Sequence, residues 1–421
     1  MDQAVNRILN TYLSLTLLST FASSFIWGIN TLFLLDAGLS ITWAFAANAF
    51  FTAGEVLFEI PTGVVADTLG RRMSYLLGSA TLFVSTILYL LLWRSSGPFW
   101  AWALVSMLLG LGFTFFSGAT EAWLVDGLNE AKFKGTLESV FAKGAVANGI
   151  AMLTGTVAGG VIAQYTNLGV PYILRAVMLC LTFIIAFLFM HDDGFTPRKS
   201  AAFLPELKSV LKASLDHGFR NPPVRWLMLS APFAGGIGIF AFYAMQPYLL
   251  QLYGGTASYS IAGIAAAIVA GAQIIGGLLV PFAGRLFHRR TSFLLAGSAL
   301  SSVALALMGL VPVFWVVLVL LTVWSIIFAA TGPIRQAFIN GLIPSAQRAT
   351  VLSSDNMLTS AGGVIFQPAL GKSADVWGYP ASYILSAGVQ LLALPFIALA
   401  LRERTPTDII KGDDAASAPD K

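Results

Sequence analysis

Cysteine, histidine and nucleotide-binding motifs are scarce in this sequence, and their scarcity argues against several kinds of chemistry. A single cysteine, Cys180, leaves no internal disulfide and no cysteine-bound metal cluster. The three histidines fall in polar stretches, so no histidine-based triad or metal site is expected within the apolar segments. No G-x-x-x-x-G-K-S/T loop is present. We therefore expect no metal, no cofactor, no ATP hydrolysis and no enzymatic activity.

Charge is scarce as well. Only 10% of the 421 residues are charged and 57% are hydrophobic, whereas a soluble domain carries about 25% charged residues to cover its surface. Glycine (40) and proline (18) are both frequent, as in membrane helices. The net charge of +4 does not indicate nucleic-acid binding, because the basic residues lie in short patches between apolar segments. The composition predicts an integral membrane protein in a lipid bilayer.

Apolar segments long enough to cross a membrane recur along the whole chain. A crossing helix needs about 20 apolar residues, and charges, glycine-proline clusters and polar runs separate about twelve such segments. They cover residues 12–34, 42–65, 74–93, 99–126, 138–164, 170–190, 224–252, 259–282, 292–311, 313–337, 349–371 and 380–401. The first is too long for the core of a signal peptide and should remain in the mature protein. The pattern predicts an all-α membrane protein with twelve transmembrane helices.

Lysine and arginine predict the orientation of these helices. With the N-terminus in the cytoplasm, only Arg94 and Lys372 lie on the outer side, and Lys143, Arg175 and Arg335 lie within spans. The other basic residues then fall on the cytoplasmic side, as the positive-inside rule requires. Both termini are therefore expected in the cytoplasm, and the compact loops suggest a bacterial inner membrane. Arg175 is expected to extend its side chain back to the outer surface.

A polar break divides the segments into two groups of six. The expected organisation is an N-terminal half at 1–190, a cytoplasmic linker at 191–223, a C-terminal half at 224–402 and a cytoplasmic tail at 403–421. Within the linker, Phe203–Leu215 places apolar side chains at helical spacing opposite lysines, which predicts an amphipathic helix on the membrane surface.

Weak internal matches at nearly constant spacing relate the two halves. Arg71 matches Arg289, 218 positions later, and Asn30 matches Gln246, 216 positions later. Parallel repeats with a site between them are one of the architectures of membrane transporters. The two halves are therefore expected to share one fold of six helices each.

The most specific motif lies between the second and third segments. It reads Gly63-Val-Val-Ala-Asp67-Thr-Leu-Gly70-Arg71-Arg72. G-x-x-x-D-x-x-G-R-R at this place resembles the signature of the major facilitator superfamily, as does the arrangement of twelve spans around a central linker. The resemblance covers nearly the whole chain and implies a secondary transporter that works by alternating access of its halves. A solvated turn whose arginines only set the topology is the alternative.

The resemblance also implies that this loop forms a cytoplasmic latch. Asp67 would face the helix starting near Thr350, because a carboxylate is favourable at a helix N-terminus. Arg71 or Arg72 would pair with Asp126 at the inner end of the fourth helix.

A second resemblance lies in the fifth segment. Gly155-Thr156-Val-Ala-Gly159-Gly160 is similar to the G-P-x-x-G-G motif of the superfamily's drug/proton antiporters, with Thr156 in place of the proline. The similarity implies antiport. Ordinary small-residue packing against a neighbouring helix is the alternative.

Acidic side chains within the apolar segments are candidates for carrying protons. Glu55 and Glu59 lie on one face of the second segment, with Glu55 near the expected midplane. Charge is costly at that depth, which suits a group that binds and releases a proton; a hydrogen-bonded structural acid is the alternative. Glu121 aligns through the repeat with Arg335. The two could pair across the halves as a gate, or each could pair within its own half.

By the family resemblance, helices one, four, seven and ten would line a substrate cavity. Polar and aromatic candidates on these helices are Trp27, Asn30, Tyr243, Gln246 and Trp324. Each could instead be a core aromatic or an interhelical hydrogen bond. Together they predict a largely apolar pocket with few polar anchors, which favours a lipophilic or amphiphilic solute.

The expected function is proton-coupled efflux, by antiport, of a small organic or drug-like compound, with the proton gradient as energy source. The partners would be the small-molecule substrate, protons and the bilayer, with the protein acting as a monomer. Two alternatives stay open: proton-coupled uptake of a sugar or other metabolite, and a sensor or scaffold derived from a transporter that no longer carries a solute.

Overall fold

The computed structural model describes residues 3–195, 208, 212, 214–254, 258–344 and 347–410. Within these residues the chain is almost entirely helical, and its β-structure is a single isolated bridge between Arg289 and Ile409. The chain divides into two units. Unit 1 comprises Met1–Leu207 with Gly254–Ala267, and unit 2 comprises Lys208–Tyr253 with Ile268–Lys421.

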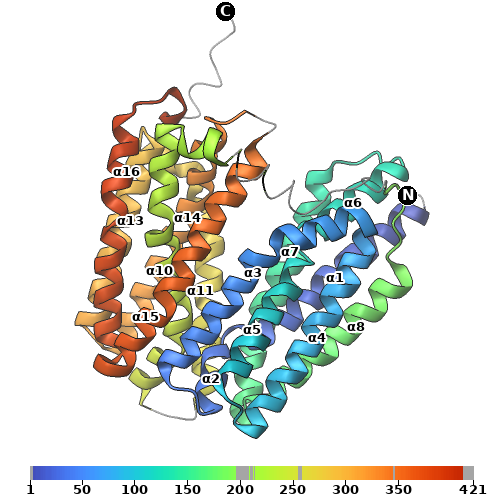
Figure 1. Ribbon diagram of the computed structural model, residues 1–421, viewed down its shortest axis with the longest axis horizontal. Helices are drawn as coiled ribbons and strands as arrows, with labels where there is room; N and C mark the ends of the chain where they lie inside the picture. Colours follow the sequence, from blue (N-terminus) through green and yellow to red (C-terminus); the bar gives the residue numbers. More distant parts are fainter. Residues whose placement is uncertain are drawn as a thin grey trace, which may run out of the picture. The chain divides into compact units, whose positions relative to one another are not determined.

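The helices of the N-terminal half run side by side in unit 1 (Figure 1). They are α1 (Gln3–Trp27), α2 (Asn30–Asp36), α3 (Ile41–Leu69), α4 (Arg71–Ser95), α5 (Phe99–Thr114), α6 (Ala119–Glu130), α7 (Leu137–Tyr165) and α8 (Gly169–Phe189). Helix α1 packs against α7 and α8, and α4 packs against α5 and α8. Helix α3 packs along α5.

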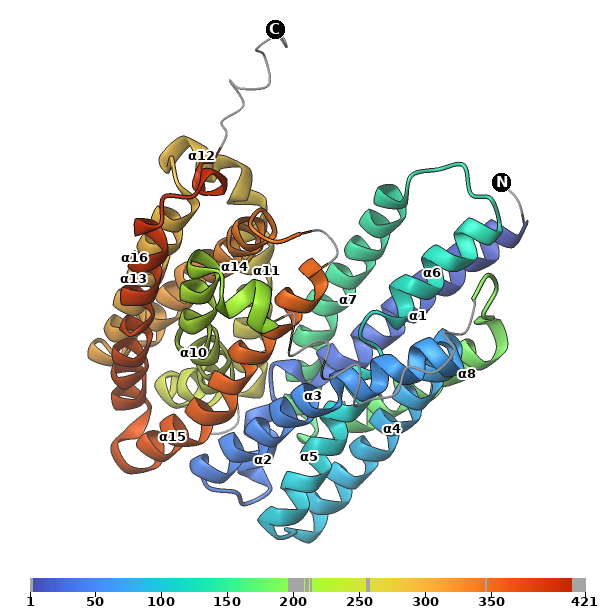
Figure 2. The same ribbon diagram turned by 45° about the horizontal axis from the view of Figure 1, so that its top comes forward.

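Unit 2 repeats part of this packing. Its elements are η1 (Ser214–Phe219), α10 (Pro222–Tyr253), α11 (Tyr259–Leu279, whose first residues belong to unit 1), η2 (Val280–Phe282), α12 (Ala283–Leu286), α13 (Arg290–Leu310), α14 (Phe314–Asn340), α15 (Arg348–Leu391), α16 (Ala393–Arg402) and η4 (Pro406–Asp408). Helix α10 packs against α15 and α16, as α1 does against α7 and α8, and α13 packs against α14 and α16 (Figure 2). The repeat seen in the sequence is thus a repeat of helix packing.

The number of membrane-crossing helices agrees with the prediction. Among the described residues ten helices are long and apolar enough to cross, or eleven if α1 and α2, which are bent by 50°, form one span. The last of them covers 53 residues, Thr350–Arg402, or roughly 80 Å at about 1.5 Å per residue, more than twice the hydrocarbon thickness of about 30 Å. It therefore contains two spans, which makes twelve. The all-α, two-half fold class is confirmed.

The fourth span is broken, which the sequence did not predict. Instead of one helix over 99–126, α5 ends at Thr114 and α6 begins at Ala119. Gly118 between them has φ +68°, a left-handed conformation that glycine adopts without the steric cost of a Cβ. The break places Glu121 in the first turn of α6, where a negative charge is favourable.

The eleventh and twelfth spans are joined by a kink rather than a loop. Gly378 has φ +82° and ψ 165° within α15, and Pro380 follows it. Proline lacks the N–H that would continue the hydrogen-bond ladder, so the helix bends here. The predicted amphipathic helix at Phe203–Leu215 lies almost wholly outside the described residues, as does the tail beyond residue 410.

Each unit has its own apolar core and an apolar exterior. Leu15, Tyr75 and Leu124 belong to a buried cluster of the N-terminal half, and Leu227 and Phe338 belong to one of the C-terminal half. Large apolar side chains also cover the outer faces of the helices, for example Ile173, Phe187, Leu278, Val303 and Val319. Apolar exteriors of this extent are stable in lipid rather than in water.

Candidate functional site

Glu55 lies at the middle of α3. Fourteen residues of the helix precede it (41–54) and fourteen follow it (56–69). Helix α5 comes so close here that a Cβ added to Gly110 would lie 2.8 Å from the backbone nitrogen of Glu55. Within the described part of the chain, no hydrogen bond or ion pair reaches the Glu55 carboxylate. Glu55 is thus an acid at mid-span whose charge no ionic partner offsets there.

Glu59 and Glu121 have different surroundings from Glu55. Glu59 lies one turn further along α3 and accepts a hydrogen bond of 2.8 Å from the hydroxyl of Ser117, in the break between α5 and α6. Glu121 is exposed at the start of α6. The hydrogen-bonded environment of Glu59 matches the structural alternative, and Glu55 remains the stronger proton-carrying candidate.

The loop with the superfamily-like motif joins α3 to α4 through one residue. That residue, Gly70, has φ +106° and is buried against the carboxylate of Asp192, so a side chain would not fit. Asp67 accepts a hydrogen bond from the Arg71 guanidinium at 2.5 Å, four residues later. Gly63 is exposed on α3, and nothing lies within 4 Å of an added Cβ.

Asp192, which follows the sixth span, contacts both arginines of the motif region. Its carboxylate accepts a hydrogen bond of 2.9 Å from the backbone N–H of Arg72, the second residue of α4. The Arg72 guanidinium donates to the carbonyl of Phe187 at 2.7 Å, and Arg71 pairs with Asp67. Among the described residues, neither arginine pairs with Asp126 as predicted; the Asp126 carbonyl lies against Gly194 instead.

The C-terminal half repeats this capping arrangement. Asp408, which follows the twelfth span and is 2% exposed, accepts a hydrogen bond of 2.8 Å from the backbone N–H of Thr291. Thr291 is the second residue of α13, as Arg72 is of α4. Sequence reasoning missed this pair of helix caps. A signal was present, because Asp192 and Asp408 are 216 positions apart, the spacing at which Asn30 matches Gln246.

Arg335 forms an ion pair within its own half. Its guanidinium donates two hydrogen bonds to the Asp355 carboxylate, at 2.8 and 2.6 Å. It also donates to the Ser230 hydroxyl at 3.1 Å and to the Leu227 carbonyl at 2.6 Å. Helices α10, α14 and α15 thus meet at this residue. The contact matches the alternative in which Arg335 pairs within the C-terminal half.

Arg175 does not extend to the outer surface, so that expectation was wrong. Arg175 is only 1% exposed, and its guanidinium donates hydrogen bonds to the Thr86 hydroxyl at 3.1 Å and to the Ala22 carbonyl at 3.2 Å. Its guanidinium lies 5.7 Å from the centre of the Phe113 ring. Helix packing around α8 holds the side chain inside the bundle, where hydrogen bonds and the ring face replace water.

The three glycines of the antiporter-like motif all lie at close helix contacts within unit 1. An added Cβ at Gly155 would meet the Ser24 hydroxyl, and one at Gly159 would meet the Phe25 carbonyl, both on α1. One at Gly160 would lie 2.8 Å from the Cα atom of Gly263 on α11. These contacts are those of small-residue packing, and any further role of the motif stays a prediction.

The predicted cavity residues lie in helix interiors or at their ends. Asn30 donates to Asn48 and accepts from the Tyr172 hydroxyl, each at 2.9 Å, and so joins α2, α3 and α8. Gln246 is 1% and Trp324 2% exposed. Trp27 ends α1 and Tyr243 lies in α10, both partly buried. The hydrogen bonds of Asn30 match the interhelical alternative for that residue.

Comparison with known proteins identifies the family. The chain is similar to the solved nucleoside transporter NupG, at 13% identity with a TM-score of 0.73, covering 94% of this chain and 99% of that one. It is similar to a POT family transporter in complex with 5-aminolevulinic acid, at 14% identity and a TM-score of 0.70, covering 94% and 95%. It is also similar to a bacterial homologue of the human lysosomal transporter Spinster, at 13% identity and a TM-score of 0.72, covering 98% of this chain and 100% of that one.

These identities are low, so the solved structures show a shared fold and not a shared substrate. No curated protein sequence matches the chain. The family profile described as Major Facilitator Superfamily matches residues 12–281 and 258–418. The two matches together span both halves. The chain is therefore a membrane transporter that belongs to the major facilitator superfamily.

Proposed function

We propose that this transporter is a proton-coupled antiporter that exports a small organic, lipophilic or amphiphilic compound by alternating access of its two halves. Glu55 carries the proton. The proton gradient supplies the energy, and the protein works as a monomer in a bacterial inner membrane. The observation that carries the proposal is the position of Glu55 at the centre of α3 with no hydrogen bond or ion pair among the described residues.

An acid in this position suits proton coupling for a physical reason. Moving a carboxylate into a low-dielectric environment without a partner is costly, whereas the protonated acid is tolerated. A conformation that exposes Glu55 to water on one side therefore favours release of the proton to that side. Glu59 already accepts a hydrogen bond from Ser117, which makes it less suited to the cycle.

The gate and latch belong to the same proposal. Asp67, Arg71 and Arg72 lie together at the cytoplasmic end of the N-terminal half in the proposed orientation. We propose that they hold the inward-closed state, with Glu121 and Arg335 closing the path when Arg335 exchanges Asp355 for Glu121. Arg335 keeps an ion-pair partner in both states, whereas Asp355, whose side chain is 8% exposed, must gain water or a proton when it loses Arg335.

Proton movement in proteoliposomes tests the proposal. A pH-sensitive dye inside the vesicles would report proton exchange when lipophilic cations or sugars are added to wild type, Glu55→Gln, Glu121→Gln and Glu138→Gln. Glu138 is exposed in the first turn of α7 and serves as the matched control. We expect a lipophilic compound to drive proton exchange through wild type and Glu138→Gln, and Glu55→Gln to abolish it.

The other outcomes discriminate between the functions. A Glu55→Gln variant that still exchanges protons would remove Glu55 from the mechanism. Proton movement in the same direction as a sugar would favour uptake by symport over efflux. Solute equilibration without proton movement would reject proton coupling, and no flux of any solute would favour a sensor or scaffold.

A further inference from the structure

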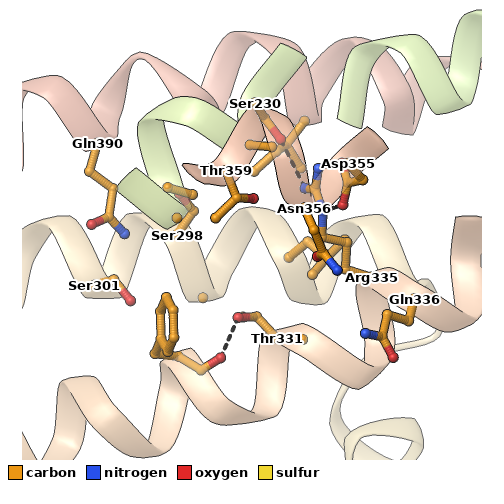
Figure 3. Close-up of a pocket in the computed structure, with 18 residues that line it drawn as sticks. Ser230, Ser298, Ser301, Thr331, Arg335, Gln336, Asp355, Asn356, Thr359 and Gln390 are labelled. Atoms are coloured by element: carbon orange, nitrogen blue, oxygen red, sulfur yellow. Dashed lines mark hydrogen bonds and ion pairs between the residues drawn. The ribbon is translucent and has the colours of Figure 1, made fainter. Parts of the chain in front are cut away.

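The C-terminal half encloses a cavity of its own. Its volume is about 230 Å³, and its walls come from α10, α13, α14, α15 and α16, all within unit 2. Figure 3 shows the Arg335–Asp355 pair toward one end of this cavity and Gln390 toward the other, with Ser301 and Thr331 between them. The kink at Gly378 divides α15 into two arms. Asp355 lies in the first arm and Gln390 in the second, so both arms line the cavity.

Two buried polar groups at this cavity have no hydrogen-bond partner in the described structure. They are the hydroxyl of Ser298, on a residue 6% exposed, and the side-chain oxygen of Gln390, on a residue 5% exposed. A buried polar group without a partner is destabilising, because it has lost its hydrogen bonds to water. Both residues line the same cavity, and a molecule bound there would supply the missing hydrogen bonds.

The charges at the cavity cancel. Arg335 and Asp355 satisfy each other through two hydrogen bonds, and the other polar wall residues are hydroxyls and amides. An ion entering the cavity would find no unpaired opposite charge and would have to break the pair. An uncharged molecule can donate a hydrogen bond to Gln390 and form one with Ser298 without breaking the Arg335–Asp355 pair.

The volume limits the size of the occupant. Drug-sized ligands occupy pockets of about 300–1,000 Å³, so this cavity of about 230 Å³ is too small for the compound proposed above. It has room for several waters or for one compact solute. An opening is available beside Gly332, Gln336 and Asn356, which line the cavity and are exposed.

We propose that the C-terminal half binds a small uncharged solute bearing hydroxyl or amide groups in this cavity, between Gln390 and the Arg335–Asp355 pair. Gln390 accepts a hydrogen bond from the solute, and Ser298 exchanges one with it. The site is separate from Glu55, which lies in the other unit, and it does not depend on proton coupling. Binding here ties both arms of α15 to α13 and α14.

Cysteine modification tests both the site and the class of its ligand. In a Cys180→Ser background, which removes the single native thiol, Ser298→Cys would place a thiol at the cavity wall. Three methanethiosulfonates would be compared: an uncharged methyl, an anionic sulfonatoethyl and a cationic trimethylammonioethyl reagent. Leu300→Cys on the same helix, 57% exposed on its apolar side, is the matched control.

We expect the uncharged reagent to modify the thiol at position 298 roughly tenfold faster than either charged reagent, and faster than it modifies the control. Ribose, a compact uncharged polyol, should slow this reaction, while ribose 5-phosphate should not. Gly332→Val should also slow it, because an added Cβ at Gly332 meets nothing within 4 Å and would project into the opening.

Several results would overturn the proposal. Equal rates for charged and uncharged reagents would reject the ligand class, and no protection by ribose would reject the site. If Ser298→Cys does not fold, Ser301→Cys, one turn away and 4% exposed, carries the same test. Because modification is measured without transport, these results are independent of the outcome for Glu55.

Discussion

At the scale of single residues, the Arg335–Asp355 pair should stabilise the protein only while both partners are present. Their side chains are 18% and 8% exposed, and breaking such a pair costs about 3–5 kcal/mol because it leaves a buried charge alone. We expect Asp355→Leu and Arg335→Leu each to lower the midpoint of thermal unfolding of the purified protein. The double variant should unfold at a higher temperature than either single variant; additive losses would contradict this.

The Asp67–Arg71 pair should behave differently. Its side chains are 31% and 21% exposed and come from the end of α3 and the start of α4; solvent-exposed ion pairs contribute only about 0.2–1 kcal/mol. Asp67→Asn should therefore leave the unfolding midpoint almost unchanged. If solute flux falls in this variant while its unfolding midpoint stays the same, the loss concerns the transport cycle. A large drop in the midpoint would show that the residue is structural.

At the scale of elements, the contact between α7 and α1 depends on glycine at position 159. A methyl group there would meet the carbonyl oxygen of Phe25, so Gly159→Ala must push the helices apart, at about 1–3 kcal/mol. Gly149 on the same helix has nothing within 4 Å of an added Cβ. Gly149→Ala should be neutral or stabilising by about 0.5–1 kcal/mol. Thermal unfolding of both variants measures this; equal effects would disprove the close contact.

The cap on α13 makes a second prediction at this scale. Asp408→Ala removes the acceptor for the Thr291 N–H and hydroxyl, and losing a helix cap costs about 0.5–2 kcal/mol. Amide hydrogen exchange at the first turn of α13 should become faster. Asp216→Ala, which removes an ion pair with Arg220 whose arginine is 77% exposed, should leave that exchange unchanged. Unaltered exchange in Asp408→Ala would mean that the cap does not hold this helix end.

At the scale of the whole molecule, twelve spans require both ends of the chain to lie on the same side of the membrane. The distribution of lysine and arginine predicts that this side is the cytoplasm. Green fluorescent protein fused after residue 410 should therefore fluoresce, and alkaline phosphatase fused there should be inactive. Phosphatase fused after Arg94 should be active. An active phosphatase at the C-terminal end would mean an odd number of spans or the opposite orientation.

Sequence patterns alone were sufficient to assign the class of the protein. The length of an apolar segment decides whether it can cross a bilayer, since lipid offers no partner for an unpaired backbone group. The Gly63–Arg72 motif indicated the superfamily, which the family profile confirms. The break at Gly118 and the kink at Gly378 were not predicted, because a pattern of residue types does not state the backbone dihedral angles that break one span and bend another.

Which polar groups meet depends on how the helices pack in three dimensions. The pairing of Arg335 with Asp355, the capping of α4 and α13 by Asp192 and Asp408, and the burial of Arg175 join residues far apart in the chain. Hydrogen bonds depend on distances of about 3 Å and on direction, and helix packing sets both. The pattern of hydrophobicity along the chain shows where each helix begins and ends, but not how the helix is rotated about its axis. That rotation decides which partner each buried side chain meets.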